Sequence, residues 1–142
     1  MIESIPPTAS LRFLPVPWPD SGVGTWANDL EERLVALAGE HGFQPSHATK
    51  SKLELVHPGR HRVVYLDRKR LRRQTIAVIV PPWVRLDDIR TVSGVTLPEK
   101  FFHSSNMRTF PKSVNTGENE IPYGYSLECV GLTVFGHLLD RI

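Results

Sequence analysis

The chain has 142 residues, a single cysteine and a formal net charge of +2, from 17 Lys and Arg against 15 Asp and Glu. This length suits one domain that buries a core without covalent staples, and one cysteine excludes an internal disulfide and a multi-cysteine zinc site. The sequence has no apolar run of 18 residues and no signal-like N-terminus, so we expect a cytoplasmic protein without a membrane partner.

Proline punctuates the start of the chain, at Pro6, Pro7, Pro15, Pro17 and Pro19. Because proline disfavours helix at its own position and at the preceding one, residues 1–22 are predicted to form a proline-rich arm. Residues 11–16 (LRFLPV) suit an edge strand or an extended segment laid over the core. Binding of this arm to a partner module is an alternative, although no flanked PxxP motif stands out.

Residues 25–41 carry the clearest helical pattern, with Thr25 as a suitable N-cap and Gly42 as a suitable left-handed stop. Acidic residues occupy the early turns, where they favour the helix dipole. The apolar residues form one stripe, made of Trp26, Leu30, Leu34, Leu37 and Ala38. We therefore predict a core helix.

Residues 60–82 (RHRVVYLDRKRLRRQTIAVIVPP) contain two strand-like runs joined by a densely basic connector. Residues 63–66 are β-branched or aromatic, and residues 75–80 are apolar at nearly every position, which indicates a central strand covered on both faces. Pro81 and Pro82 end the second run. A shorter alternating run at 52–57, followed by the turn signal at Pro58 and Gly59, predicts a preceding strand.

The connector concentrates positive charge, since residues 60–73 hold seven Lys and Arg and only Asp67 as an acid. Arginine forks match phosphate oxygens, and neutralised phosphates release counterions, so this run indicates a phosphate-binding hairpin. The alternative is a solvated hairpin tip that guards the sheet against edge-to-edge pairing.

Residues 83–125 lack a long periodic segment and are predicted to form a long polar loop with short elements at 84–92 and 94–97. In this loop Ser104, Ser105, Asn106, Arg108 and Lys112 suit an anion-binding surface. Three aromatic residues could stack against bases or seal the loop: Phe110, Tyr123 and Tyr125. The alternative is an ordered loop whose Asn and Ser side chains cap its own backbone.

The last segment, residues 126–142, places Leu127, Val130, Val134 and Leu138 on one stripe, which predicts a closing helix from Ser126 to Arg141. The resulting fold class is α+β, with a small antiparallel sheet of about three to five strands around the basic hairpin, packed by an N-terminal and a C-terminal helix. Residues 23–142 would form this single domain.

Three functions fit the sequence, and we favour nucleic-acid binding, to RNA or DNA, over an enzyme. The second is a protein-interaction module that binds an acidic partner. The third is a metal-independent RNase in which His57, His61 or His103 would act with Arg62 and Tyr65. We predict no metal and no cofactor, because no ligand spacing is recognisable. The predicted nucleic-acid-binding residues are Arg60, Arg62, Arg68, Lys69, Arg70, Arg72, Arg73, Arg108 and Lys112.

Overall fold

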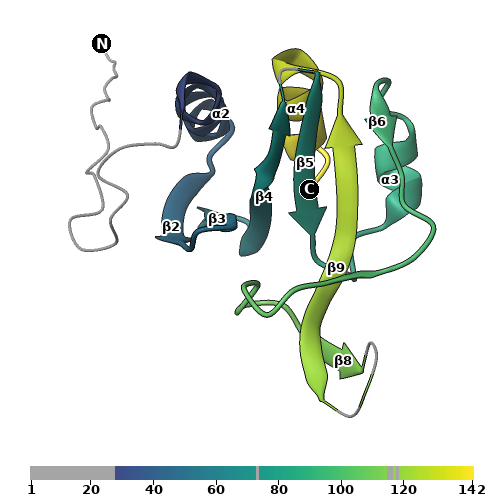
Figure 1. Ribbon diagram of the computed structural model, residues 1–142. Helices are drawn as coiled ribbons and strands as arrows, with labels where there is room; N and C mark the ends of the chain where they lie inside the picture. The colour runs from purple at the N-terminus through teal and green to yellow at the C-terminus, as the bar shows by residue number, and fades with distance from the viewer. Residues whose placement is uncertain (1–27, 73, 115–116, 118) are drawn as a thin grey trace.

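The computed structural model describes residues 28–72, 74–114, 117 and 119–142. The described part of the chain contains three helices and eight strands (Figure 1). In chain order these are α2 (Asp29–Glu40), β2 (Gln44–Ala48), β3 (Lys52–His57), β4 (Arg62–Arg72), β5 (Thr75–Val80), α3 (Leu86–Arg90), β6 (Val95–Thr96), β7 (Phe102–His103), β8 (Lys112–Val114), β9 (Glu120–Cys129) and α4 (Leu132–Leu139). The predicted α+β class is confirmed.

One antiparallel sheet organises these elements. Its strand order is β2-β3-β4-β5-β9-β6, and β7 and β8 also pair with β9. The expectation of three to five strands was therefore too small, because β9 adds a long strand that pairs with β5 on one side and with three short strands elsewhere. β5 lies in the middle and is buried along nearly its whole length, as its unbroken apolar run predicted.

The basic run lies on strand β4 itself and not in a hairpin connector. β4 spans 11 residues, and its register against β5 shifts between Leu66, which faces Val78, and Leu71, which faces Ile76. Five steps along β4 therefore match two steps along β5, so the extra residues form a bulge. The prediction of a basic tip was wrong because the strand continues through the charged residues.

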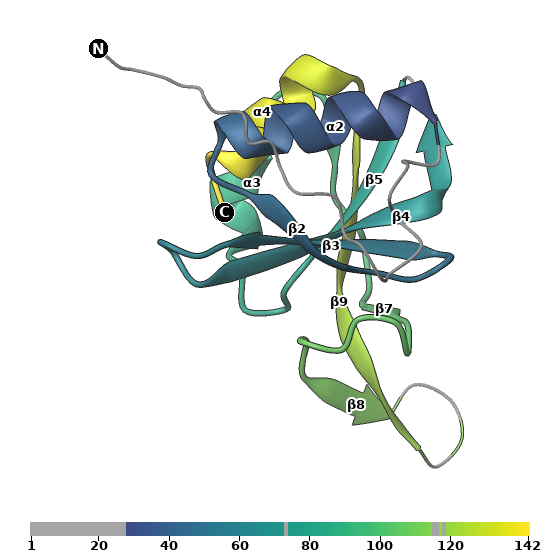
Figure 2. The ribbon, with the colours of Figure 1, turned by 90° about the vertical axis from the view of Figure 1, so that its left-hand side faces the viewer.

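Helices α2 and α4 cover one face of the sheet, as Figure 2 shows. Their buried residues, including Leu34, Phe135 and Leu138, join inward-facing residues of β3, β4, β5 and β9 in the main core. The N-cap of α2 is Asn28, whose Oδ1 accepts a hydrogen bond from the Glu31 backbone N–H at 2.9 Å. Thr25, the predicted N-cap, lies outside the described residues. Gly42 follows the helix with φ of 87°, as a left-handed stop requires.

The opposite face, which we call the outer face, carries a second apolar cluster. Tyr65 and Ile79 from the sheet contact Met107 and Phe110 from the segment that follows β7. The ring of Phe110 packs edge-on against Tyr65, with ring centroids 4.9 Å apart. Gly124 of β9 permits this packing, because a Cβ at that position would overlap a backbone oxygen of β5 and press on the Phe110 ring.

The predicted loop at 83–125 and the predicted helix at 126–141 both need correction. The loop region contains α3, β6, β7, β8 and the first half of β9, while the helix begins only at Leu132. Leu127 and Cys129 are buried in the main core, and Ser126 and Glu128 alternate with them on β9. This period of two is that of a strand, which explains why the helix starts later.

The proline-rich arm at 1–22 lies outside the described residues. Within the described ranges, no helix is both long enough and apolar enough to cross a membrane.

Candidate nucleic-acid interface

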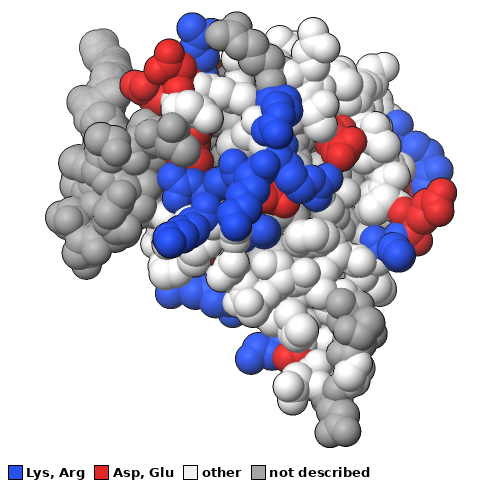
Figure 3. Space-filling view, viewed as in Figure 1, with Lys and Arg blue, Asp and Glu red and all other residues white. Residues whose placement is uncertain are grey.

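The structure places eight of the nine predicted cationic residues, and it separates them into several environments. Lys69, Arg70, Arg72 and Arg108 are exposed on the outer face, and we call these four residues the outer-face patch. Figure 3 shows Lys and Arg side chains gathered near the middle of this face. Arg68 lies on the helix side of the sheet, Arg60 and Arg62 lie at the far end of β4, and Lys112 lies on β8. Arg73 lies outside the described residues.

The burial of Leu71 determines the direction of the arginine side chains on either side of it in β4. Leu71 is buried in the main core beneath the helices, so the adjacent Arg70 and Arg72 point to the outer face. The guanidinium of Arg70 crosses β5 to reach β9, where it donates to Glu128 at 2.9 Å and to Ser126 at 3.4 Å. The Arg70 side chain is 43% exposed, so a large part of it remains available to solvent.

Arg68 has a structural role. Its Nε and Nη2 donate to the two carboxylate oxygens of Glu31 on α2, at 2.8 and 2.9 Å, and its Nη1 donates to the Thr49 carbonyl oxygen at 2.8 Å. The Glu31 side chain is 0% exposed and that of Arg68 only 13%. This bidentate pair fastens helix α2 to β4, and it removes Arg68 from the set of residues that could meet a ligand.

A buried ion pair lies under the patch. Lys52 Nζ lies 3.7 Å from Asp67 Oδ1, and Arg70 Nη1 lies 3.6 Å from Asp67 Oδ2. Burial lowers the pKa of Lys52, attraction to Asp67 opposes this shift, and repulsion from Arg70 and Lys69 adds to it. Lys52 thus carries its charge at some electrostatic cost, which the Asp67 carboxylate partly offsets.

Arg108 is held above a second buried acid, Glu54. Its Nε and Nη2 each donate to the Glu54 carboxylate at 3.1 Å, while Tyr65 Oη and Ser46 Oγ donate at 2.8 and 2.6 Å. Burial alone would raise the pKa of Glu54, but the hydrogen bonds from Arg108, Ser46 and Tyr65 together lower it. Arg108 remains 57% exposed, so its outer edge faces solvent.

Two members of the patch differ from the others. Among the described residues, neither the Lys69 ammonium nor the Arg72 guanidinium makes an ion pair. Toward the described part of the chain, the one hydrogen bond of the Arg72 side chain is donated to the backbone oxygen of Leu71, at 3.0 Å. Lys69 and Arg72 therefore supply the positive charge of this face that no described carboxylate offsets.

The remaining predicted cations do not join the patch. Arg60 Nη1 donates to the Leu139 carbonyl oxygen at 3.3 Å, which ties the β3–β4 turn to α4. Arg62 pairs with His57 at the start of β4, ten residues before Arg72. Because the bulge shortens β4 between Leu66 and Leu71, these ten residues correspond to about seven ladder steps, or about 23 Å.

The polar segment after β7 is more structural than predicted. Asn106 Nδ2 donates to Ser51 Oγ at 2.6 Å, and its backbone N–H donates to Ser104 Oγ at 3.4 Å. Phe110 is only 4% exposed, so its ring is not available for base stacking. Tyr123 and Tyr125 both contact the ring of Phe101, with centroid distances of 4.8 and 4.9 Å.

The structure brings only part of the RNase set together, since His57 and Arg62 are cross-strand partners, whereas His103 lies on β7 and Tyr65 is buried. His57 packs edge-on against Phe43, whereas His103 stacks on Tyr123 and shares a hydrogen bond of 3.0 Å with Ser113. Tyr65 is wholly buried, and this burial raises its pKa to about 12. Its hydroxyl is committed to Glu54 and to Thr109, so it cannot reach a substrate.

Sequence reasoning missed three buried acids, Glu31, Glu54 and Asp67, which determine what the cations do. One signal was available, because Lys52 and Glu54 share a face of a strand whose remaining residues up to Val56 are apolar (KLELV). The partners of these acids come from segments distant in sequence, so local patterns could not identify them.

Comparison with models of known protein families finds no match, and neither does comparison with curated proteins. In the ranges that the structure describes, no group of three or more His, Cys, Asp or Glu residues is arranged to hold a metal ion.

Proposed function

We propose that this protein binds the phosphate backbone of a nucleic acid across the outer-face patch. The observation that carries the proposal is the exposure of Lys69 and Arg72, without ion pairs among the described residues, beside the partly exposed Arg70 and Arg108. Charges gathered on one open sheet face can contact successive phosphates, and contacts of this kind carry no sequence information.

The salt dependence of the binding constant distinguishes whether only the unpaired cations contact phosphate or the ion-paired arginines do so as well. For duplex DNA, the logarithm of the binding constant falls with the logarithm of salt concentration by about 0.9 per neutralised phosphate. Contacts from Lys69 and Arg72 alone give a slope of roughly −1.8. If Arg70 and Arg108 also contact phosphate, the slope becomes steeper, at roughly −3.6. The measured slope therefore reports whether the ion-paired arginines also contact phosphate.

The experiment is fluorescence anisotropy of labelled RNA and DNA, single- and double-stranded, over a salt series. We expect Lys69→Glu and Arg72→Glu each to weaken binding. The matched control is Arg141→Glu, since Arg141 is also exposed but follows α4 on the helix side of the sheet. Equal loss in the control, or no binding at low salt, would overturn the proposal, and absence of binding would favour an acidic protein partner.

A variant that removes the acidic partner of a patch arginine should strengthen binding, whereas the lysine and arginine replacements should weaken it. Glu128→Gln removes the carboxylate that accepts from Arg70, so we expect tighter binding and a slope steeper by about 0.9. Gel analysis of the same labelled strands in EDTA tests the enzyme alternative, because shortened strands would indicate RNase activity in place of simple binding.

A further inference from the structure

Aromatic rings gather at one end of strand β9. Phe101 is 45% exposed and packs on Tyr123 and Tyr125, with ring centroids 4.8 and 4.9 Å apart. Tyr125 also packs against the main core, so this row of rings lies on the helix side of the sheet. Figure 2 shows β7 beside the part of β9 that extends beyond α2 and α4. The helices therefore leave the ring of Phe101 open to solvent.

Trp83 supplies a second exposed ring at the same end of the sheet. This residue is 56% exposed. It follows Val80, the last residue of β5, by three positions, so the two Cα atoms lie within about 11 Å of each other. Val80 in turn pairs with Tyr125 in the ladder between β5 and β9. Of the Phe, Tyr and Trp residues that the structure describes, only Trp83 and Phe101 are exposed.

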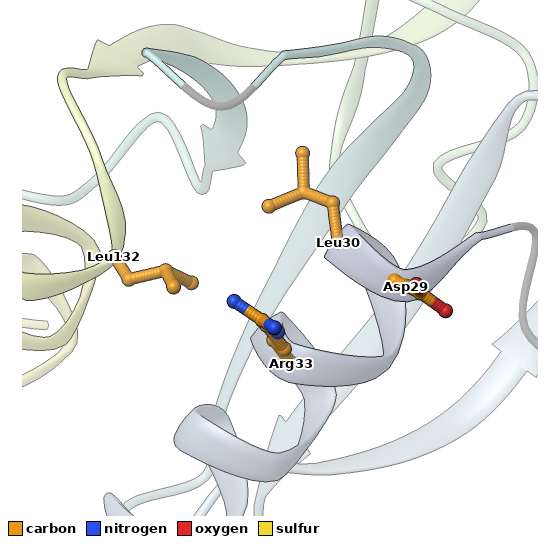
Figure 4. A pocket seen from close by; sticks show the side chains of 4 residues that line it. All are labelled: Asp29, Leu30, Arg33 and Leu132. Carbon is orange, nitrogen blue, oxygen red and sulfur yellow. The ribbon is translucent and has the colours of Figure 1, made fainter.

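The cavity between α2 and α4 has a different chemical character. Its volume is about 170 Å³, and Figure 4 shows Leu30 and Arg33 from α2 across from Leu132 of α4. No aromatic residue is among the described residues that line it. A flat surface for stacking is therefore found at the end of β9 and not in this cavity.

A chain of contacts connects the aromatic end of β9 with the outer-face patch. The Asp67 carboxylate lies 3.6 Å from Arg70 and 3.7 Å from Lys52. The Lys52 ammonium lies 5.5 Å from the centre of the Phe102 ring, which packs against the second apolar cluster on the outer face. Phe101, the preceding residue, points to the helix side. Among the described strands β7 pairs only with β9, so the two rings flank an open edge of the sheet.

We propose that a single-stranded nucleic acid runs from the outer-face patch over the β7 edge and stacks its bases on Phe101 and Trp83. This inference rests on the proposed function and names single strands as the class of nucleic acid. Unpaired bases expose their flat faces, and stacking on aromatic side chains holds single strands with little sequence preference. The backbone must also turn from one face of the sheet to the other at β7. A duplex, whose persistence length is about 50 nm, does not bend so sharply.

Fluorescence anisotropy with a labelled single strand and a duplex of the same sequence tests the inference. The variants are Phe101→Leu and Trp83→Leu, which keep an apolar side chain but remove the flat ring. We expect each to weaken single-strand binding on the order of tenfold and to leave duplex binding unchanged. Because stacking neutralises no phosphate, the salt slope for the single strand should stay the same.

Two controls accompany these variants. Val130→Ala shortens an apolar side chain that is also exposed but follows the other end of β9, so it should bind as the native protein does. Circular dichroism melting curves show whether each variant is folded at the assay temperature. Trp83 belongs to no helix or strand, so Trp83→Leu still tests the inference if Phe101→Leu unfolds.

The patch variants separate failure of this inference from failure of the proposed function. Lys69→Glu and Arg72→Glu should weaken binding of the single strand and of the duplex, with flatter salt slopes for both. If they do so while Phe101→Leu and Trp83→Leu bind the single strand as the native protein does, the stacking site alone is overturned. Absence of any nucleic-acid binding by the native protein would overturn both proposals and would assign the exposed rings to a protein partner.

Discussion

Replacement of Arg68 by alanine should destabilise the protein strongly without changing the outer-face patch. The substitution removes both hydrogen bonds to the Glu31 carboxylate and the bond to the Thr49 carbonyl oxygen. Because the Glu31 side chain is buried, it then loses the guanidinium that offsets the desolvation of its charge.

The size of the effect follows from burial. Removing one partner of a buried ion pair costs about 3–5 kcal/mol, and the partial exposure of Arg68 places the expected loss near the lower limit, about 3 kcal/mol. For a chain of this length, 1 kcal/mol corresponds to a change in melting temperature of roughly 4 °C. We therefore expect Arg68→Ala to lower the melting temperature by about 10–15 °C.

Urea and thermal denaturation measure this loss, and the next residue supplies the control. Lys69 is exposed and makes no ion pair among the described residues, so Lys69→Ala should change the free energy of unfolding by less than about 0.5 kcal/mol. In anisotropy titrations at a temperature where both variants are folded, only Lys69→Ala should bind nucleic acid more weakly, although Arg68→Ala is the less stable variant. A loss below 0.5 kcal/mol for Arg68→Ala would refute the assignment of Arg68 to the α2–β4 contact.

Three further predictions concern buried groups. The folded-state pKa of Glu54 is lowered, so the contribution of this carboxylate to stability is complete above its unfolded pKa and disappears as pH falls through its folded pKa. Between about pH 5 and pH 3, the free energy of unfolding of Glu54→Gln, measured by urea titration, should therefore fall less than that of the native protein. With a pKa of about 12, Cys129 should resist a colorimetric thiol reagent at about pH 8 until urea unfolds the protein, and rapid reaction without urea would contradict its burial. Gly124→Ala should lower the melting temperature, because its Cβ would overlap the Val80 carbonyl oxygen, whereas Gly39→Ala should raise it, since a Cβ there meets nothing within 4 Å and alanine favours helix by up to about 1 kcal/mol.

Elements with a strong local period were predictable from the sequence. The α2 stripe, the alternating β3 and the apolar β5 all appear near their expected positions. β9 was missed because Pro122 and Gly124 weaken a strand pattern, and because Leu127 can be placed on a helical stripe with later residues. The ladder of β9 with β5 pairs Cys129 with Ile76 and Tyr125 with Val80, and local propensity does not report pairing between segments this far apart in sequence.

The charge of the candidate site was predictable in amount but not in placement. The concentration of Lys and Arg on residues 60–73 is visible in the sequence, and the outer-face patch does draw three of its four members from this run. The pairing of Arg68 with Glu31 joins residues 37 positions apart, and that of Arg108 with Glu54 joins residues 54 apart. Only the packed fold determines which cations remain available.

The bulge in β4 couples the core to the patch. Strict alternation from Leu66, which faces the helices, would turn Arg68, Arg70 and Arg72 toward the core and Leu71 toward solvent. The register shift between Leu66 and Leu71 changes this pattern after Arg68, so Leu71 returns to the core while Arg70 and Arg72 point outward. One local irregularity therefore avoids burying two more cations beside α2 and also creates the exposed charge on which the proposed binding depends.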